Sequence, residues 1–202
     1  MVKFVFASRN KHKAKEVYAI LKNCLTFDFE ILTLDDIGFE GEIIEDGSTF
    51  EENALIKAKA AYEKSKIDSF ADDSGLEVNA LNGAPGIYSA RYASVDGRDS
   101  DDLANNALLL KNLEGVSDRS GQFVAAVAYV GESGSFTVRG EVKGDILTAP
   151  EGNGGFGYDP LFCSHEANCC FGKLPPEEKN KISHRARALF AFAQEMNKRY
   201  SK

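Results

Sequence analysis

The sequence predicts an α/β protein built on a mixed sheet, and three observations indicate this class. Strand-like apolar runs alternate along the chain with amphipathic segments of helical periodicity. Two of the strand-like runs, residues 123–130 and 135–142, are separated only by Gly-Glu-Ser-Gly, which is typical of an antiparallel hairpin. No internal repeat or long linker divides the 202 residues, so a single domain over residues 1–202 is expected.

The elements follow in order from these patterns. Residues 2–7 form the first predicted strand, residues 11–22 the first helix and residues 27–34 the second strand. Thr49 followed by Glu52 fits a capping box that begins a helix ending near Ser65. The remaining expected elements are a short strand ending at Ala71, an extended stretch over 76–81, a helix over 101–113, a glycine-rich loop over 151–160 and a closing helix over 183–200.

Composition excludes several classes of function. With 31 acidic and 24 basic residues the net charge is −7, which argues against a surface that coats nucleic acid. No apolar run reaches the length of a membrane span, and no signal-peptide pattern begins the chain, so a cytoplasmic protein without membrane contact is expected. The four cysteines lack metal-site spacing and are expected to be free thiols.

Polar and basic residues cluster between the first strand and the first helix: Ser8, Arg9, Asn10, Lys11, His12 and Lys13. A turn from strand to helix exposes backbone amides that bind anions, and lysine adds positive charge there. The turn has no glycine and is not a P-loop. The alternative is that Ser8 or Asn10 only caps the helix while the basic side chains face water.

A second group of polar residues contains the adjacent carboxylates Asp72 and Asp73, which precede Ser74 and Gly75 after a short strand. Two carboxylates at a strand end are a plausible Mg²⁺ site, and one of them can also take a proton from an attacking water. The alternative is a solvated turn. Further ligands could come from the acidic loop. The core face predicted for the helix at 49–65 is formed by Glu51, Ala54, Leu55, Ala58, Ala61 and Tyr62. Lys57 lies on the shoulder of that face and could present its ammonium group to a cleft, and the alternative is a lysine at the surface. The acidic residues of that loop include Glu42, Glu45 and Asp46.

A third group lies in the glycine-rich loop and in the segment before the last helix. The glycines of the loop leave the rings of Phe156 and Tyr158 relatively unencumbered, so an aromatic ring there could stack on a nucleobase, although a core-facing anchor is the commoner role. Ser183 fits an N-cap, and His184 and Arg185 place positive charge in the first turn, where the helix dipole disfavours it. Such an unfavourable placement hints at a ligand.

The motifs are more specific together than apart. In order they are A-[ST]-x-N-x-x-K at 7–13, T-F-x-E-N-A-x-x-K-A at 49–58, A-D-D-S-G-L at 71–76, G-x-P-G-x-Y-S-A-R-Y at 83–92, G-x-G-G-F-G-Y-D-P at 152–160 and S-H-R at 183–185. In this combination the chain closely resembles the inosine triphosphate pyrophosphatase family, which acts on non-standard purine nucleoside triphosphates. The resemblance extends over nearly the whole chain.

The resemblance implies a two-lobed fold around a long mixed sheet, a substrate cleft between the lobes, and a homodimer. It implies Mg²⁺-dependent hydrolysis of ITP, dITP or XTP to the monophosphate and pyrophosphate. Residues 8–13 and Lys57 would bind the triphosphate, Asp73 would be the metal-linked general base, and Ser74 would contact the substrate. The base would be held by the loop residues Phe156, Gly157, Tyr158 and Asp159, and its 6-keto edge by Lys179, His184 and Arg185.

One position departs from the family pattern. Many relatives carry two successive glutamates in the acidic loop, whereas here Ile44 takes the first position and Glu45 the second. Glu45 is therefore the predicted second metal ligand beside Asp73. Two alternatives to this activity remain at this stage. One is a related pyrophosphatase for modified pyrimidine or methylated nucleotides, and the other is a nucleotide sensor without turnover.

Overall fold

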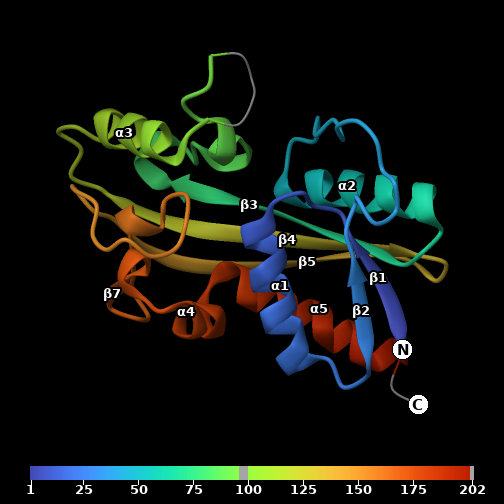
Figure 1. Cartoon of the computed structure of the whole chain (residues 1–202). Helices are drawn as coiled ribbons and strands as arrows, with labels where there is room; N and C mark the ends of the chain where they lie inside the picture. The colour runs from blue at the N-terminus through green and yellow to red at the C-terminus, as the bar shows by residue number, and fades with distance from the viewer. Residues whose placement is uncertain (96–99, 201–202) are drawn as a thin grey trace. The chain divides into compact units, whose positions relative to one another are not determined.

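The computed structural model describes residues 1–95 and 100–200 (Figure 1). Within these residues a seven-stranded sheet has the order β2-β1-β3-β4-β5-β6-β7. β1 pairs in parallel with β2 and β3, whereas β6 pairs antiparallel with β5 and β7, so the predicted mixed α/β sheet is confirmed. The strands are β1 (Val2–Phe6), β2 (Phe29–Leu32), β3 (Ser69–Val78), β4 (Ser120–Gly131), β5 (Gly134–Ile146), β6 (Phe162–Ser164) and β7 (Cys169–Cys170).

Apart from one short helix over residues 176–182, the helices of the described residues begin and end close to their predicted bounds. They are α1 (Lys11–Cys24), α2 (Phe50–Ser65), α3 (Asp102–Asn112), α4 (Pro176–Ile182) and α5 (His184–Tyr200), with 3-10 turns η1 (Asn79–Leu81), η2 (Gly86–Arg91), η3 (Asp159–Leu161) and η4 (Phe171–Lys173). None of the helices in the described ranges is both long and apolar enough to cross a membrane.

The first helices are capped by side chains that the sequence indicated. The Asn10 side chain accepts hydrogen bonds from the backbone N–H groups of His12 and Lys13 at the start of α1. Thr49 Oγ1 accepts from the Glu52 N–H at 3.1 Å at the start of α2. The Glu52 carboxylate accepts from the N–H of Ser48 at 2.6 Å, so the reciprocal half of the box reaches one residue further back.

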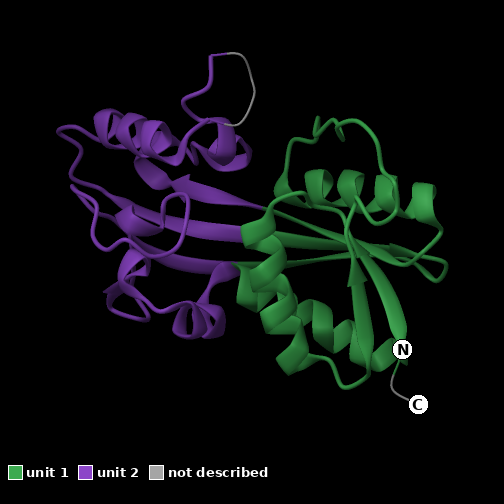
Figure 2. Cartoon of the chain, viewed as in Figure 1, with its two compact units in different colours: residues 1–73, 125–140, 185–202 green, residues 74–124, 141–184 purple. Residues whose placement is uncertain are grey.

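Two compact units divide the chain, and each is built from separate segments (Figure 2). Unit 1 contains residues 1–73, 125–140 and 185–202, and unit 2 contains residues 74–124 and 141–184. Because their ranges cross these boundaries, β3, β4 and β5 each contribute residues to both units.

The core of unit 1 lies where α1 and α5 pack on the strands. Rings from β1, β3 and α5 form its centre, with Phe70 at 5.0 Å from both Phe6 and Phe192 between ring centroids. Val17 and Leu21 add the apolar stripe of α1 to the same cluster. α2 lies on the opposite side of these strands from α1 and α5 (Figure 1).

In unit 2 the core is formed by α3 and the distal parts of β3, β4 and β5. Leu109 of α3 and Leu113, which follows the last residue of that helix, are buried in a cluster with Phe123, whose ring centroid lies 4.6 Å from that of Phe162. Tyr158 belongs to this cluster as well. The glycine-rich loop is therefore anchored in the core of unit 2 by one of its two aromatic side chains.

The prediction of separate extended pieces around residues 72–75 was wrong. Residues 69–78 form one continuous strand, β3, so the two aspartates lie inside a strand rather than in a turn after one. The sequence Asp-Asp-Ser-Gly does not favour a strand by its local preferences, but hydrogen bonding with the neighbouring strands overrides those preferences. Residues 79–81, predicted as extended, form the turn η1, and the short elements α4, β6 and β7 were not predicted.

Candidate functional site

The turn after β1 contains the first group of predicted phosphate ligands. Asn10 Oδ1 accepts from the N–H groups of His12 and Lys13 at 3.0 and 3.1 Å, and Ser8 Oγ accepts from Asn10 N at 3.2 Å. The capping role of Asn10 is therefore established. Of the basic side chains here, Lys13 is half-buried, whereas Lys11 and His12 are exposed.

Arg9 has a different set of contacts from its neighbours. Its guanidinium donates to the backbone carbonyls of Gly41 at 2.6 Å and Phe39 at 2.8 Å, in the loop that precedes the acidic residues. These contacts tie the loop to the turn after β1. In this structure Arg9 therefore positions the loop, and a role in phosphate binding stays a prediction.

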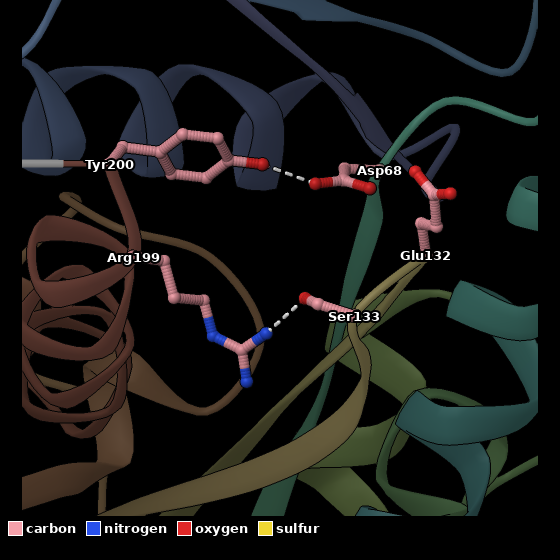
Figure 3. A pocket seen from close by; sticks show the side chains of 5 residues that line it. All are labelled: Asp68, Glu132, Ser133, Arg199 and Tyr200. Carbon is pink, nitrogen blue, oxygen red and sulfur yellow. Dashed lines mark hydrogen bonds between the residues drawn. The ribbon is translucent and has the colours of Figure 1, made fainter.

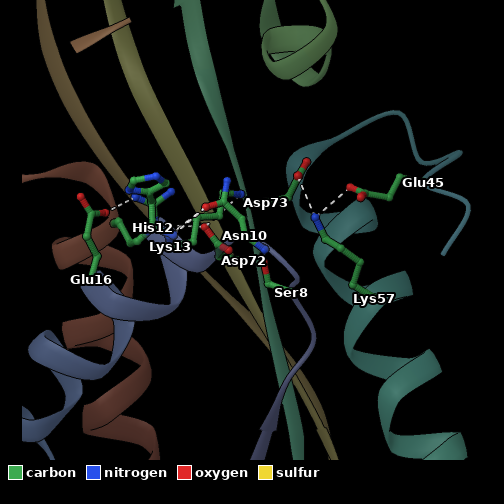
Figure 4. Close-up of polar contacts among 10 residues, drawn as sticks. Ser8, Asn10, His12, Lys13, Glu16, Glu45, Lys57, Asp72 and Asp73 are labelled. Atoms are coloured by element: carbon green, nitrogen blue, oxygen red, sulfur yellow. Dashed lines mark hydrogen bonds and ion pairs between the residues drawn. The ribbon is translucent and has the colours of Figure 1, made fainter. Parts of the chain in front are cut away.

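Asp72 and Asp73 point to opposite faces of β3, because successive side chains of a strand alternate (Figure 4). Asp72 meets Lys13 and Arg185, at 3.4 and 3.1 Å from its Oδ2. Asp73 meets Lys57, whose Nζ lies 2.9 Å from Asp73 Oδ1. The two carboxylates are adjacent in sequence, but they form ion pairs with different cations.

The environment of Asp72 keeps its carboxylate ionised. Burial alone would raise the pKa of Asp72, but the positive charges of Lys13 and Arg185 outweigh it and hold that pKa well below its usual range. Oδ1 of Asp72 is buried and accepts no hydrogen bond from any described residue. Oδ2 of Asp72 therefore contacts two cations, while Oδ1 has no hydrogen-bond donor among the described residues.

Arg185 is fully buried and links two carboxylates of unit 1. Its Nε donates to Asp72 Oδ2 at 3.1 Å, and its Nη1 donates to the Glu16 carboxylate. The guanidinium thus joins α5 to α1 and to β3. Its predicted contact with the 6-keto edge of a base is not tested by this arrangement and stays a prediction.

On the other face of β3, Lys57 lies between two carboxylates. Its Nζ donates to Glu45 Oε2 at 2.8 Å and to Asp73 Oδ1 at 2.9 Å (Figure 4). Burial alone would lower the pKa of Lys57, but the attraction of Asp73 and Glu45 raises it above its usual range. The ammonium group is therefore charged, and it attracts both carboxylates and offsets part of their negative charge.

The pKa of Asp73 moves in the opposite direction from that of Asp72. Burial is the largest cause and the negative charge of Glu45 adds to it, and together they raise the pKa of Asp73 against the attraction of Lys57 and Lys13. A raised pKa makes a carboxylate a stronger base than an exposed aspartate. Of the two adjacent carboxylates, Asp73 is therefore the one suited to accept a proton.

The face of α2 that carries Lys57 was predicted only in part. Ala54, Ala58 and Ala61 are buried as expected, but Lys57 and Asn53 are buried with them, whereas Leu55 and Tyr62 are only half-buried. The helix is thus rotated towards Lys57 relative to the predicted core face. An ion pair with two carboxylates offsets the cost of burying this lysine.

A divalent cation fits the donor set around Asp73 and Glu45. Both side chains supply carboxylate oxygens, and Lys57 contacts one oxygen of each, so a cation would bind the other oxygen of each carboxylate. Across the described ranges, no group of three or more His, Cys, Asp or Glu side chains could hold a metal ion by itself. A Mg²⁺ ion here would therefore take its other ligands from water and phosphate oxygens.

In unit 2, Asp159 organises the glycine-rich loop. Its Oδ2 accepts from the Phe156 N–H at 2.8 Å and from Lys179 Nζ at 2.6 Å. The same Nζ lies 4.7 Å from the centroid of the Phe156 ring. Phe156, Asp159 and Lys179 are thus brought together as predicted site residues, with the ring half-buried and the two charged side chains buried.

Two other predicted residues of unit 2 are core residues. Tyr158 is 4% exposed and its hydroxyl donates to Ser89 O at 2.8 Å, so the expectation that both aromatic rings of the loop stand clear is wrong for Tyr158. His184 is buried, and its ring stacks on Phe123 at 4.7 Å between centroids. Ser74 is half-buried at the start of the segment of β3 that belongs to unit 2.

The chain matches a known protein family and curated relatives over nearly its whole length. The model of the Ham1 family matches residues 4–195. The chain belongs to the Ham1 family. Among its curated relatives, a dITP/XTP pyrophosphatase of Geobacter sulfurreducens is 47% identical over 94% of each chain, and one of Clostridium perfringens is 48% identical over 94% of each. These matches confirm the resemblance that the motifs indicated.

Solved Ham1 structures have the same fold. A HAM1 protein from Coxiella burnetii superposes with a TM-score of 0.87 at 35% identity, covering 98% of this chain and 100% of that one. The Ham1 protein of Staphylococcus aureus gives 0.86 at 36% identity, covering 98% and 99%. The fold of this Ham1 chain is therefore that of its family over essentially the whole length.

Sequence reasoning missed residues that hold the site of this Ham1 chain in place. Asn53 is 1% exposed, and its Oδ1 accepts from Gly47 N at 2.9 Å, which ties the acidic loop to α2. A Cβ at Gly47 would lie 2.7 Å from that Oδ1, so the loop can approach only because residue 47 is a glycine. Asn53 stands inside the quoted motif at 49–58, and that was the signal available.

A cavity of unit 1 lies at a different place from the predicted site. It measures about 470 Å³ and is lined by Asp68, Glu132, Ser133, Arg199 and Tyr200 (Figure 3). Asp68 accepts from the hydroxyl of Tyr200, and Arg199 donates to Ser133. The lining includes none of the predicted site residues, so this cavity is not part of the predicted nucleotide site.

Proposed function

We propose that this Ham1 chain is a nucleoside triphosphate pyrophosphatase that hydrolyses ITP, dITP and XTP to the monophosphate and pyrophosphate with Mg²⁺. The observation that carries this proposal is the triad of Lys57, Asp73 and Glu45, in which a buried ammonium lies between two carboxylates. Such a group suits a reaction that needs charge neutralisation and a base rather than a covalent nucleophile. The names of the curated relatives, dITP/XTP pyrophosphatases, support the substrate class.

The substrate's phosphates are assigned to residues of unit 1. Lys13 and Lys57 neutralise phosphate oxygens, together with the turn at residues 8–13. Mg²⁺, when bound by Asp73 and Glu45, supplies further positive charge against the developing negative charge. The Asp73 carboxylate accepts the proton of the water that attacks the α-phosphorus, for which its raised pKa is favourable.

The base is assigned to residues of unit 2. Phe156 offers an aromatic face for stacking, and Lys179 and His184 offer donors for the 6-keto oxygen of hypoxanthine or xanthine. Adenine carries an amino group at that position, which would leave donors without acceptors and disfavour ATP. Arg185 is the third predicted contact with the 6-keto edge. As a donor, it too would suit a 6-keto oxygen and not the amino group of adenine.

The identity of the products tests the proposal. Incubation of the purified chain with ITP and Mg²⁺ should yield IMP and pyrophosphate, separated by ion-exchange chromatography. In water enriched in ¹⁸O the label should appear in IMP and be absent from pyrophosphate, because the attack is on the α-phosphorus. Release of IDP and inorganic phosphate, or label in pyrophosphate, would overturn the assignment of the attack to the α-phosphorus.

The assembly and location of the enzyme belong to the same proposal. We expect a homodimer acting on a small nucleotide in the cytoplasm, with no nucleic-acid partner. Sedimentation equilibrium of the purified chain should give twice the monomer mass, and a monomer at micromolar concentration would contradict this.

A further inference from the structure

The glycine-rich loop of unit 2 is held to α3 by two side chains that belong to none of the predicted site residues. Asp102 Oδ2 accepts from Gly157 N at 2.7 Å, and Asn106 Nδ2 donates to Gly157 O at 3.1 Å. Asp102 and Asn106 are four residues apart on α3, so they lie on the same face of that helix. Both backbone polar groups of Gly157 are therefore bound by one helix.

These contacts complete the fixation of the backbone around Phe156. Asp159 Oδ2 accepts from the Phe156 N–H at 2.8 Å, and the Phe156 carbonyl accepts from Asp159 N at 3.3 Å. With Asp102 and Asn106 on Gly157, four consecutive backbone polar groups, from Phe156 N to Gly157 O, have partners. The ring of Phe156 thus stands on a backbone whose polar groups are held by hydrogen bonds to the protein itself.

Gly157 itself requires such partners to keep its conformation. Its φ is +61°, in the left-handed region that glycine adopts readily but does not prefer over many others. A Cβ at this position would meet no atom within 4 Å, so neighbouring side chains do not fix the residue by packing. Hydrogen bonds to Asp102 and Asn106 therefore define the backbone on the C-terminal side of Phe156.

Stability alone does not account for the two side chains. Asn106 is 7% exposed, and its Oδ1 is buried and accepts no hydrogen bond from any part of the chain that the structure describes. A buried acceptor without a donor disfavours the folded state. Asp102 is exposed, where a single hydrogen bond contributes little to folding. Both side chains are better explained by where they place the loop.

We infer that Asp102 and Asn106 are positioning residues for base binding. They hold the loop in one conformation, so that little conformational entropy of the loop is lost when the base binds to Phe156. The inference rests on the proposed function only in taking the base to bind at residues 156–159. Pre-ordering favours binding more than it favours the chemical step, since the reacting phosphate is not contacted by either residue.

The test compares Asp102→Ala and Asn106→Ala with Asn105→Ala. Asn105 is a matched control because it is a buried asparagine on the same helix, but its Oδ1 accepts from Ala93 N at 2.8 Å instead of contacting the loop. We expect the first two variants to raise KM for ITP about tenfold while kcat stays within about twofold, as loss of one positioning hydrogen bond implies. Asn105→Ala should leave KM within about twofold of wild type.

Two further measurements separate positioning from general destabilisation. Hydrogen exchange of peptides over residues 156–158 should accelerate in Asp102→Ala and Asn106→Ala and stay slow in Asn105→Ala. The double variant should raise KM no more than about twofold above the larger single effect, because both side chains act on one loop. Faster exchange with unchanged KM, or equal KM effects in all three variants, would overturn the inference.

Failure of the inference is distinguishable from failure of the proposed function. Calorimetric titration with ITP, with Ca²⁺ in place of Mg²⁺, measures the Kd for ITP separately from its hydrolysis with Mg²⁺. If wild type binds ITP but forms no IMP, the proposed hydrolysis fails, and a tenfold weaker Kd in Asp102→Ala and Asn106→Ala would still support positioning. If Phe156→Ala weakens binding and those two variants do not, the hydrolysis stands and positioning is wrong.

Discussion

Lys57 Nζ lies 2.9 Å from Asp73 Oδ1, and this ion pair is buried. The same ammonium contacts Glu45, so one cation attracts both carboxylates that are proposed to bind Mg²⁺. It offsets part of the repulsion between them. The two ion pairs also explain why a lysine is buried on a face of α2 that carries Ala54, Ala58 and Ala61.

Replacement of Asp73 by Asn should abolish most hydrolysis of ITP and leave the fold intact. The amide keeps the size of the side chain but cannot accept the proton of water, and loss of a general base costs about 10²–10⁴-fold in kcat. Steady-state rates with saturating ITP and Mg²⁺ measure the effect, and circular dichroism controls for folding. A purified variant that keeps more than about a tenth of wild-type kcat would falsify the role of Asp73.

The pH dependence of the rate should follow the raised pKa of Asp73. The base is active when deprotonated, so a pKa above the usual range moves the acid limb of the profile to higher pH than an exposed aspartate would give. We expect kcat to rise with pH from the acid side as Asp73 loses its proton, and to continue rising into the alkaline range because water on the metal is deprotonated more easily there. A flat profile from about pH 6 to 10, with chemistry rate-limiting, would contradict this expectation.

Removal of divalent cations should stop the reaction without unfolding the protein. Lys57 contacts both Glu45 and Asp73 and offsets part of their mutual repulsion, so the fold at this place does not depend on a metal for its only positive charge. Excess EDTA should therefore abolish IMP formation and shift Tm by less than about 2 °C, and added Mg²⁺ should restore the rate. A large fall in Tm on chelation would mean that the metal, not Lys57, stabilises this part of the fold.

Arg185→Ala should destabilise unit 1. The guanidinium is buried between Asp72 and Glu16, and its removal leaves buried carboxylates with too few partners, which costs about 3–5 kcal/mol. Urea unfolding of the variant measures the loss. Arg187→Ala is the control on the same helix, since Arg187 is only half-buried and its removal should cost about 1 kcal/mol or less. Equal losses in both variants would mean that the buried ion pairs are not what Arg185 contributes.

If Arg185 also contacts the base, a second effect appears in the folded fraction of Arg185→Ala. The ratio of kcat/KM for ITP to that for ATP should then fall towards one, because a donor to the 6-keto oxygen is lost. An unchanged ratio would leave base recognition to Lys179, His184 and the loop at 156–159.

Phe156→Ala should weaken binding of ITP more than it slows the chemical step. Base stacking on an aromatic ring contributes about 1–3 kcal/mol, which corresponds to a rise in KM of roughly 5- to 150-fold. Phe156→Tyr retains the aromatic face and serves as the control, with an expected KM close to wild type. If Phe156→Ala and Phe156→Tyr gave the same KM as wild type, the ring would be an anchor of the loop and not a contact of the base.

Much of the fold and of the candidate site could be predicted from local pattern. The capping residues Asn10 and Thr49 begin α1 and α2 as expected, because capping depends on a few consecutive residues. The hairpin between β4 and β5 was located by its turn, for the same reason. The motifs also named the charged residues that the structure brings together within each unit.

The position of Asp72 and Asp73 inside β3 could not be obtained in this way. Asp-Asp-Ser-Gly has the local preferences of a turn, and only pairing with the neighbouring strands makes it extended. That difference decides the chemistry, since strand alternation sends Asp72 to Lys13 and Arg185 and sends Asp73 to Lys57. The opposite shifts of their pKa values follow from this separation.

By itself the sequence determined the fold class, the family and the types of residue at the site, since all three are properties of composition, periodicity and motif order. The tertiary structure decided which groups become partners: Lys57 pairs with Glu45, Arg185 pairs with Glu16, and Asn106 donates a hydrogen bond to the Gly157 carbonyl. These partners are 12, 169 and 51 residues apart along the chain. Electrostatic and hydrogen-bond partners depend on distances in space, and no local pattern encodes distances between segments so far apart.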